Sequence, residues 1–150
     1  MRIVVLVGLP GSGKSTYLER IGAAGLSSDA IRRLLADDAT DQTINDRVFE
    51  TLRCLLRQRL ALGRPVTYVD ATNLTPQERL PYIAIGADYG CQVEALYFDT
   101  PLDVCRQRNA GRARVVPEEA LDKMQEKLVP PTTAEGFARV TRVSELEPLA

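Results

Sequence analysis

The residues best suited to chemistry lie near the start of the chain. Residues 8–16 read Gly-Leu-Pro-Gly-Ser-Gly-Lys-Ser-Thr and directly follow an apolar run at residues 3–7. This is the P-loop pattern Gly-x-x-x-x-Gly-Lys-Ser, whose glycines let the backbone turn tightly and bring its amides close to an anion. The positive end of the helix that follows adds to this attraction. The pattern therefore predicts a site for a nucleoside triphosphate with magnesium.

Individual residues of this loop have expected tasks. Lys14 is expected to reach the β- and γ-phosphates of ATP, and the Ser15 hydroxyl is expected to coordinate Mg²⁺. The other phosphate contacts are expected from Gly11, Ser12, Gly13 and Thr16. The alternative is a glycine-rich turn that binds nothing, but the strand before the loop and the helix after it favour the P-loop.

A carboxylate and an arginine follow the loop, three residues apart. Asp29 and Arg32 lie in the segment Ser-Asp-Ala-Ile-Arg at a predicted helix start, so they share a face. The carboxylate can accept a proton from an attacking hydroxyl, and the arginine can hold an anionic acceptor through paired hydrogen bonds. The structural alternative is that Asp29 or Ser28 only caps the helix and Arg32 is solvated.

A second carboxylate ends a predicted strand in the segment Val-Asp-Ala-Thr-Asn at residues 69–73. Asp70 occupies the place of a Walker-B carboxylate, where it is expected to bind Mg²⁺ through a water molecule. Thr72 and Asn73 are expected to orient a phosphate or the acceptor. The alternative is an Asp-Asn turn without a ligand.

Four arginines fall within the ten residues 105–114. Arg108 and Arg112 are four residues apart, between two predicted helices. Arginines near a transferring phosphoryl group neutralise the charge that develops in the transition state, so residues from about 105 to 117 are interpreted as a lid. The alternative is a solvated basic loop.

The remaining sequence predicts the elements that must position these residues. Predicted strands fall at residues 3–7, 25–28, 66–70, 93–98 and 137–143. Predicted helices fall at residues 14–21, 29–35, 43–62 and 75–89, and two more begin near residues 100 and 117. The segment 75–78 is a capping box, and Thr100-Pro101 is expected to begin its helix by the same device.

The alternation of strands and helices predicts an α/β fold of the P-loop NTPase type. We expect a three-layer sandwich with a parallel sheet of about five strands, helices on both faces and a small arginine-bearing lid. The active site should lie at the carboxyl ends of the strands.

Composition narrows the class of protein. The 150 residues suit one domain, residues 1–150, and the net charge of −1 predicts no general attraction to nucleic acid or membrane. No apolar stretch is long enough to cross a bilayer. Cys54, Cys91 and Cys105 are far apart and there is no histidine, which argues against a zinc site and for buried thiols in a reducing cytoplasm. Without histidine, a carboxylate is the expected general base.

Together these segments resemble the 5′-hydroxyl polynucleotide kinase family of P-loop phosphotransferases. The family order is a P-loop, Ser-x-Asp-x-x-Arg, an Asp-Ala-Thr-Asn-like strand end and an arginine-bearing lid followed by Val-Pro. The matching segments here are residues 8–16, 27–32, 70–73 and 108–117. The resemblance therefore covers nearly the whole chain.

The resemblance implies roles for single residues. Asp29 matches the general base that activates the 5′-hydroxyl, and Arg32 matches the residue that grips the phosphate of the acceptor. Lys14, Ser15 and Asp70 match donor-phosphate, metal and acidic strand-end residues. Arg108 and Arg112 match lid arginines, and Arg114 could replace one of them.

The sequence thus predicts an ATP-dependent phosphotransferase that moves the γ-phosphoryl group to a hydroxyl. The best acceptor is the 5′-hydroxyl end of DNA or RNA. One alternative is a zeta-toxin-like or metabolite kinase that acts on a small molecule or sugar nucleotide. Another is a nucleotide-binding switch without catalysis. The Asn-Lys-x-Asp signature of guanine recognition does not occur, which argues against a GTPase.

Overall fold

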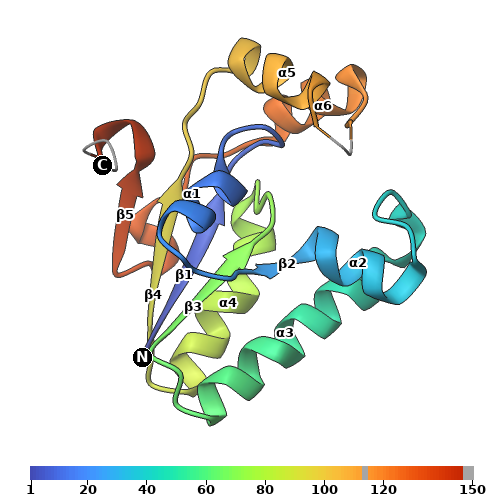
Figure 1. The fold of residues 1–150 in the computed structure, drawn as a ribbon. Coiled ribbons are helices and arrows are strands. Elements are labelled where there is room, and N and C mark those ends of the chain that lie inside the picture. Colours follow the sequence, from blue (N-terminus) through green and yellow to red (C-terminus); the bar gives the residue numbers. More distant parts are fainter. Residues whose placement is uncertain (113–114, 147–150) are drawn as a thin grey trace.

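A parallel sheet of five strands forms the centre of the molecule (Figure 1). The computed structural model describes residues 1–112 and 115–146. The strands lie in the order β2-β3-β1-β4-β5, and every neighbouring pair is parallel. Their bounds are Arg2–Val7 for β1, Leu26–Ser27 for β2, Val66–Asp70 for β3, Gln92–Tyr97 for β4 and Arg139–Arg142 for β5.

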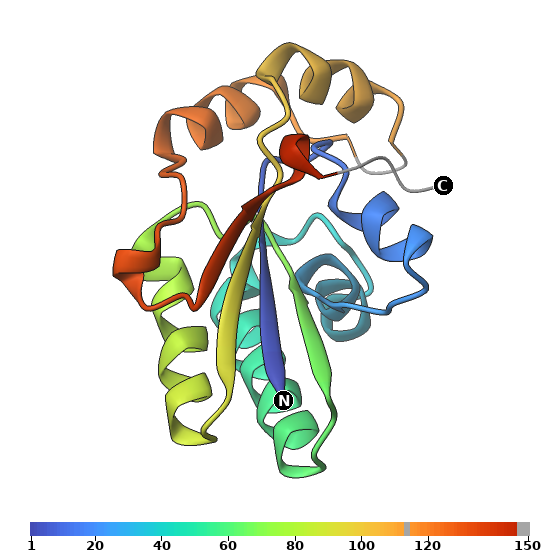
Figure 2. The ribbon, with the colours of Figure 1, turned by 90° about the vertical axis from the view of Figure 1, so that its left-hand side faces the viewer.

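Helices cover both faces of the sheet, which confirms the predicted fold class. In Figure 2, α3 and α4 lie on one side of the strands and α1 on the other, while α5 and α6 lie above the carboxyl ends. The helices are α1 (Lys14–Arg20), α2 (Ser28–Ala36), α3 (Asn45–Ala61), α4 (Pro76–Asp88), α5 (Leu102–Ala110) and α6 (Glu118–Lys127). No helix within residues 1–112 and 115–146 has the length and apolar character needed to cross a membrane.

The central strand β1 is buried on both sides. Ile3, Val5 and Val7 pack into the core beneath α3 and α4, and Val4 and Leu6 pack on the α1 side. A strand with two covered faces has no polar side to alternate with, so its sequence is a continuous apolar run. This strand leads directly into the P-loop and holds it on a rigid base.

Strand register brings the two predicted acidic segments together. Ser27, the last residue of β2, lies beside Asp70, the last residue of β3. The Ser27 side chain caps α2 by accepting a hydrogen bond from the Ala30 amide at 3.1 Å. The alternative that Ser28 or Asp29 serves as this cap is therefore wrong, and Asp29 follows in the first turn.

The expectation that Thr100 caps α5 is also wrong. Pro101 occupies the cap position of α5, and no side chain bonds to the free amides there. The Thr100 hydroxyl instead donates to the carbonyl of Ser12 in the P-loop at 2.8 Å. The segment before α5 is thus tied to the phosphate-binding loop, while the capping box predicted at Thr75 for α4 is confirmed.

Buried thiols were expected at all three cysteines, and the structure contradicts this at Cys54. Cys91 and Cys105 are buried, but Cys54 is exposed. It points away from the buried stripe of α3, which consists of Val48, Leu52, Leu56 and Leu60.

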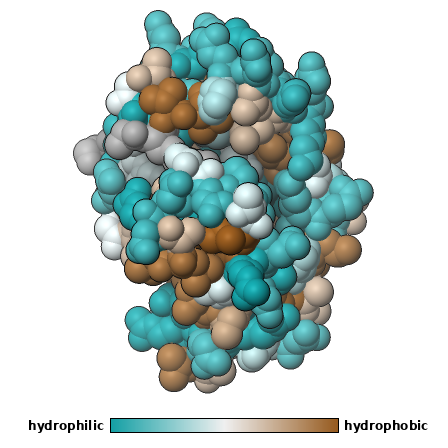
Figure 3. All heavy atoms as spheres, turned by 90° about the vertical axis from the view of Figure 1, so that its right-hand side faces the viewer, coloured by the Kyte–Doolittle hydropathy of each residue, from teal (hydrophilic) through white to brown (hydrophobic). Residues whose placement is uncertain are grey.

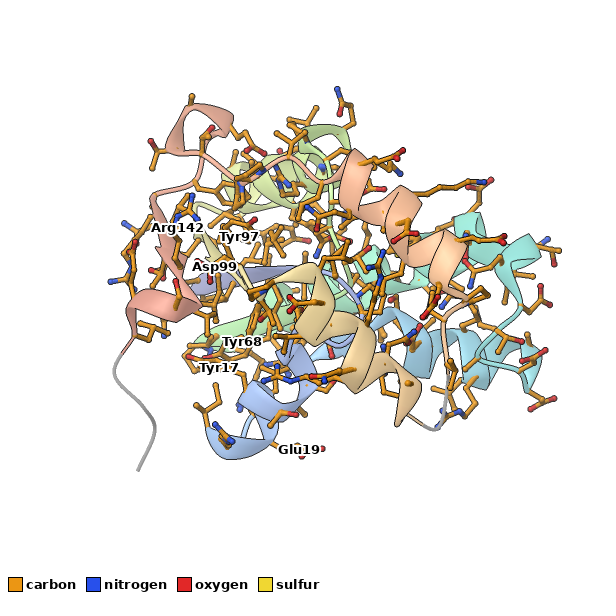
Figure 4. All side chains as sticks on the ribbon, turned by 90° about the horizontal axis from the view of Figure 1, so that it is seen from above. Tyr17, Glu19, Tyr68, Tyr97, Asp99 and Arg142 are labelled. Atoms are coloured by element: carbon orange, nitrogen blue, oxygen red, sulfur yellow. The ribbon has the colours of Figure 1, made fainter. Side chains whose placement is uncertain are left out.

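Charged and aromatic side chains hold β5 against β4 near the cavity. The Arg142 guanidinium lies 5.2 Å from the centre of the Tyr97 ring and 3.6 Å from Asp99, and these three side chains lie together in Figure 4. The Ser144 hydroxyl donates to Asp99 at 2.5 Å. The neighbouring Val143 lines the cavity described next, so these contacts position one of its walls.

Candidate active site

A cavity of about 1160 Å³ lies at the carboxyl ends of the strands, beneath α5 and α6. It brings together most of the residues predicted to form the site: the P-loop, Asp29, Arg32, Asp70, Thr72, Arg108 and Arg112. Seen from the α2 side (Figure 3), hydrophilic side chains dominate the upper half of the molecule, where the lid lies. Ligand sites of open parallel sheets lie in this place because loops from several strands converge there.

Two glycines give the P-loop its shape. Gly11 and Gly13 have φ angles of +81° and +103°, which side chains other than glycine rarely adopt. A Cβ atom at Gly11 would lie 2.7 Å from the carbonyl oxygen of Cys105, so α5 approaches the loop closely at this point. The loop can therefore turn into α1 with its amides facing the cavity.

Lys14 is held at the floor of the cavity by its own loop. Its Nζ donates to the carbonyls of Gly8 at 2.8 Å and Leu9 at 3.0 Å. A protonated amine has three N–H donors, so one remains for a ligand. Burial lowers the pKa of Lys14 to about 8, a change that the negative charge of Asp70 partly opposes. An anionic phosphate would favour the charged form of this amine.

Ser15 and Asp70 form the oxygen pair expected for magnesium. The Ser15 hydroxyl donates to Asp70 Oδ2 at 3.5 Å. Burial raises the pKa of Asp70, and the charge of Lys14 opposes this rise. Hydroxyl and carboxylate oxygens suit Mg²⁺, which commonly takes its other ligands from water and phosphate. Residues 1–112 and 115–146 contain no group of three or more acidic, cysteine or histidine residues that could hold a metal.

Asp29 lies between two guanidinium groups. Arg32 Nη1 donates to Asp29 Oδ1 at 2.9 Å, and Arg112 Nη2 lies 3.9 Å from Asp29 Oδ2. Arg32 is almost fully buried, and its Nη2 donates to Asn45 Oδ1 at 2.8 Å. Arg32 is thus bound to protein groups on two sides, and it orients the carboxylate of Asp29.

Three buried polar atoms at this cavity have no hydrogen-bond partner among the described residues: Ser12 Oγ, Arg32 Nε and Arg112 Nη1. Buried polar groups are normally paired, and each of these belongs to a side chain that lines the cavity. Two are guanidinium nitrogens and one is a hydroxyl, and all of them can donate to phosphate oxygens. The residues present therefore fit a phosphate-bearing ligand.

The structure separates the lid arginines. Arg108 lies over the P-loop, since its Nη1 would be 3.5 Å from a Cβ atom added at Gly13. Arg112 instead lies beside Asp29. Arg106 instead forms an ion pair with Asp122 on α6. Arg114, which was considered as a substitute for one of these arginines, lies outside the described residues.

Asn73 does not reach the cavity, in contrast to Thr72. Its side chain is buried, and its amide donates to the carbonyls of Leu6 at 2.7 Å and Ala71 at 3.3 Å. The direct contact with phosphate or acceptor that was expected of Asn73 is therefore corrected. The side chain joins the end of β3 to β1, which positions Asp70 and Thr72.

One buried arginine had no signal in the sequence. Arg79 is fully buried and makes two hydrogen bonds to the carboxylate of Glu135, at 2.8 and 2.9 Å. Its Nη1 also donates to the carbonyls of Asn73 at 2.9 Å and Val129 at 3.0 Å. This side chain joins the segment after β3 to the segment after α6, so it positions two walls of the cavity.

Comparisons with known proteins identify the family of this chain. The model of the AAA domain family AAA_33 matches residues 3–131. The chain is 28% identical to the bifunctional polynucleotide phosphatase/kinase of Schizosaccharomyces pombe. This match covers 94% of the chain and 33% of the yeast protein. The chain belongs to the AAA_33 family and is a P-loop kinase domain. It spans a third or less of the length of the curated relatives it matches.

Solved structures agree on the fold. A putative kinase from Chloroflexus aurantiacus superposes with a TM-score of 0.75 at 14% identity, and the match covers 97% of this chain and 88% of that one. The APS kinase CysC of Mycobacterium tuberculosis, in complex with AMPPNP and APS, superposes with a TM-score of 0.59 at 20% identity, over 97% and 90% of the chains. The fold is thus the α/β fold of P-loop NTPases.

Proposed function

We propose that this chain transfers the γ-phosphoryl group of ATP to the 5′-hydroxyl end of DNA or RNA. One observation carries the proposal: Asp29 lies in the same cavity as the P-loop, oriented by Arg32 at 2.9 Å and approached by Arg112 at 3.9 Å. A carboxylate beside a phosphate-binding loop is the arrangement that activates a hydroxyl for attack on a phosphoryl group.

The donor half of the site consists of the P-loop. Its amides and the third N–H of Lys14 would bind the phosphates, and Ser15 and Asp70 would hold Mg²⁺. When bound, Mg²⁺ neutralises negative charge on the β- and γ-phosphates. Arg108 lies over Gly13, where its charge stabilises the phosphoryl group in transfer.

The acceptor half consists of α2 and the lid. Asp29 accepts the proton of the attacking 5′-hydroxyl and holds that oxygen in line with the phosphoryl group. Arg32 keeps the Asp29 carboxylate in place, and its free Nε donates to a phosphate of the acceptor. The similarity to the fission-yeast phosphatase/kinase supports a nucleic acid end as the acceptor.

Transfer of labelled γ-phosphate from Mg-ATP to a short 5′-hydroxyl oligonucleotide tests this function. The wild type should label the oligonucleotide, and Asp29→Ala should lower kcat by about 10²- to 10⁴-fold because the general base is lost. ATP should still bind, because the P-loop that would hold its phosphates is unchanged in this variant, and the hydrogen bond and ion pair lost with Asp29 are those to Arg32 and Arg112. Asp88→Ala, at the exposed end of α4, is the matched control and should be fully active.

Each failure has a separate meaning. Normal turnover by Asp29→Ala would refute the role of Asp29 as base. ATP binding by the wild type without any labelled oligonucleotide would refute the nucleic acid acceptor. A panel of sugars and nucleosides would then distinguish a small-molecule kinase from a nucleotide-binding switch.

A further inference from the structure

The cavity continues beyond the groups that the phosphoryl transfer uses. From Asp70 its lining follows the chain through Leu74 to Glu78 at the start of α4. The opposite wall is the face of α6 that carries Lys123 and Lys127. At about 1160 Å³ the cavity exceeds the ~300–1,000 Å³ common for one small ligand. The cavity is thus larger than a site for one small ligand, as a site for both a nucleotide donor and an acceptor must be.

The part of the cavity between the start of α4 and α6 carries basic side chains. Lys123 and Lys127 are four residues apart, so they share one face of α6, and both are exposed. Lys123 makes no ion pair among the described residues, while Lys127 Nζ donates to Glu78 Oε1 at 2.8 Å. Both side chains of this pair are at least a third exposed, and such pairs contribute little stability. Lys127 can therefore exchange Glu78 for a phosphate at small cost.

Positive charge is concentrated in the cavity. Among the described residues that line it, seven are Lys or Arg and three are Asp or Glu, whereas the whole chain has a net charge of −1. Lys14 and Arg108 lie at the P-loop, and Arg112 lies at Asp29. The two lysines of α6 lie apart from these cations on another helix. Basic side chains along a groove are typical of contacts to a nucleic acid backbone.

We propose that Lys123 and Lys127 form a second phosphate-binding subsite, which holds the acceptor strand beyond its first nucleotide. The proposal rests on the proposed function and assigns the substrate class more narrowly, as a single strand of several nucleotides rather than a mononucleotide. The end nucleotide lies at Asp29, and the following phosphates lie against α6.

Acceptors of different length test this subsite. The double variant Lys123→Ala/Lys127→Ala should raise KM for a 5′-hydroxyl octanucleotide at least fivefold more than KM for a nucleoside 3′-monophosphate. The slope of log KM against log salt for the octanucleotide should fall by about 1.4, since each phosphate contact on a single strand contributes about 0.7. Arg57→Ala/Arg64→Ala, which removes two exposed cations from the α3 end, is the matched control and should change neither value.

Equal changes for both acceptors, or no change for either, would overturn the subsite. Binding of a fluorescent octanucleotide to the protein with AMPPNP, followed by anisotropy, separates this result from failure of the proposed function. If the wild type transfers no phosphate, the proposed function fails. Octanucleotide binding that the lysine variant weakens would still support the subsite, and binding that is absent or unchanged in the variant would overturn it.

Discussion

The floor of the cavity is formed mainly by backbone groups, whereas the lid contributes side chains. The floor is the P-loop, where the proposed phosphate contacts come mainly from backbone amides. The buried residues of β1 and positive φ angles at Gly11 and Gly13 hold this backbone in place. The lid consists of α5 and the loop that follows it to Pro117, and the groups that it directs into the cavity are the tips of the long side chains of Arg108 and Arg112. In α5 only Cys105 and Asn109 are buried.

This difference predicts how each region responds to substitution. A backbone site is altered by any added atom that moves the chain, whereas a lid arginine can be replaced in function by a neighbour on the same loop. The two regions meet where the Thr100 hydroxyl donates to Ser12 and where the Cys105 carbonyl approaches Gly11. Substitutions at this contact should show which region is less tolerant.

The largest effect is expected from Gly11→Ala. The new Cβ atom would lie 2.7 Å from the Cys105 carbonyl oxygen, so either the P-loop or α5 must shift. Gly22→Ala is the matched control, because its φ of +69° is similar but nothing lies within 4 Å of its Cβ position. Both variants carry the cost of a left-handed alanine, about 1–2 kcal/mol.

We expect Gly11→Ala to lower kcat/KM by at least 100-fold and Gly22→Ala to lower it by less than threefold. Thermal unfolding measures the strain common to both variants, and steady-state kinetics measures the additional effect at the loop. Equal losses of activity would show that the close approach of α5 does not matter and that the floor tolerates change as well as the lid does.

The same contrast explains what the sequence could predict. The P-loop was identifiable because its backbone shape requires glycines at known spacing, and Asp70 because it ends an apolar run. The tasks of Thr100 and Arg79 were missed, because each depends on a partner tens of residues away and no local pattern records the pairing. Thr100 resembled a helix cap because Thr-Pro is a frequent start signal.

In the lid, the sequence located the group of arginines but not the position of each. Arg106, Arg108 and Arg112 have the same chemistry, and only the structure shows that Arg106 pairs with Asp122 while the others line the cavity. Charge patterns locate a basic segment, whereas the direction of each side chain depends on the helix phase and the packing of α5 on its neighbours.

A smaller effect is expected at Asn109, which closes the lid loop. Its buried side chain donates to the Val116 carbonyl at 2.6 Å and accepts from the Val116 amide at 2.9 Å. Arg112 lies within the loop so closed. Asn109→Ala leaves both backbone groups unpaired, a loss of about 1–3 kcal/mol, and should lower kcat roughly tenfold by displacing Arg112.

A double-mutant cycle distinguishes positioning from general destabilisation. If Asn109 acts through Arg112, then Asn109→Ala should lower kcat little further in an Arg112→Ala background. Additive losses of kcat would mean that Asn109 only stabilises the fold. Asn109→Asp keeps the acceptor for the Val116 amide but places a buried carboxylate oxygen against the Val116 carbonyl, so it should not restore the kcat of the wild type.

An effect of similar size to that of Asn109→Ala concerns the pH dependence of nucleotide binding at the floor. Burial lowers the pKa of Lys14 to about 8 in the free protein, and adjacent phosphates raise it in the complex, so binding takes up a proton above that pH. The affinity for AMPPNP should therefore be constant below pH 8 and about tenfold weaker at pH 9 than at pH 7. Calorimetry in buffers of different ionisation enthalpy measures the proton uptake directly.

The Lys14→Arg variant is the control, because the guanidinium of arginine stays charged across this pH range. Its affinity for AMPPNP should vary with pH only through ionisation of the nucleotide itself. If the wild type and Lys14→Arg vary with pH in the same way, the cation of the floor is not the buried amine of Lys14, and charge in the lid must supply the attraction instead.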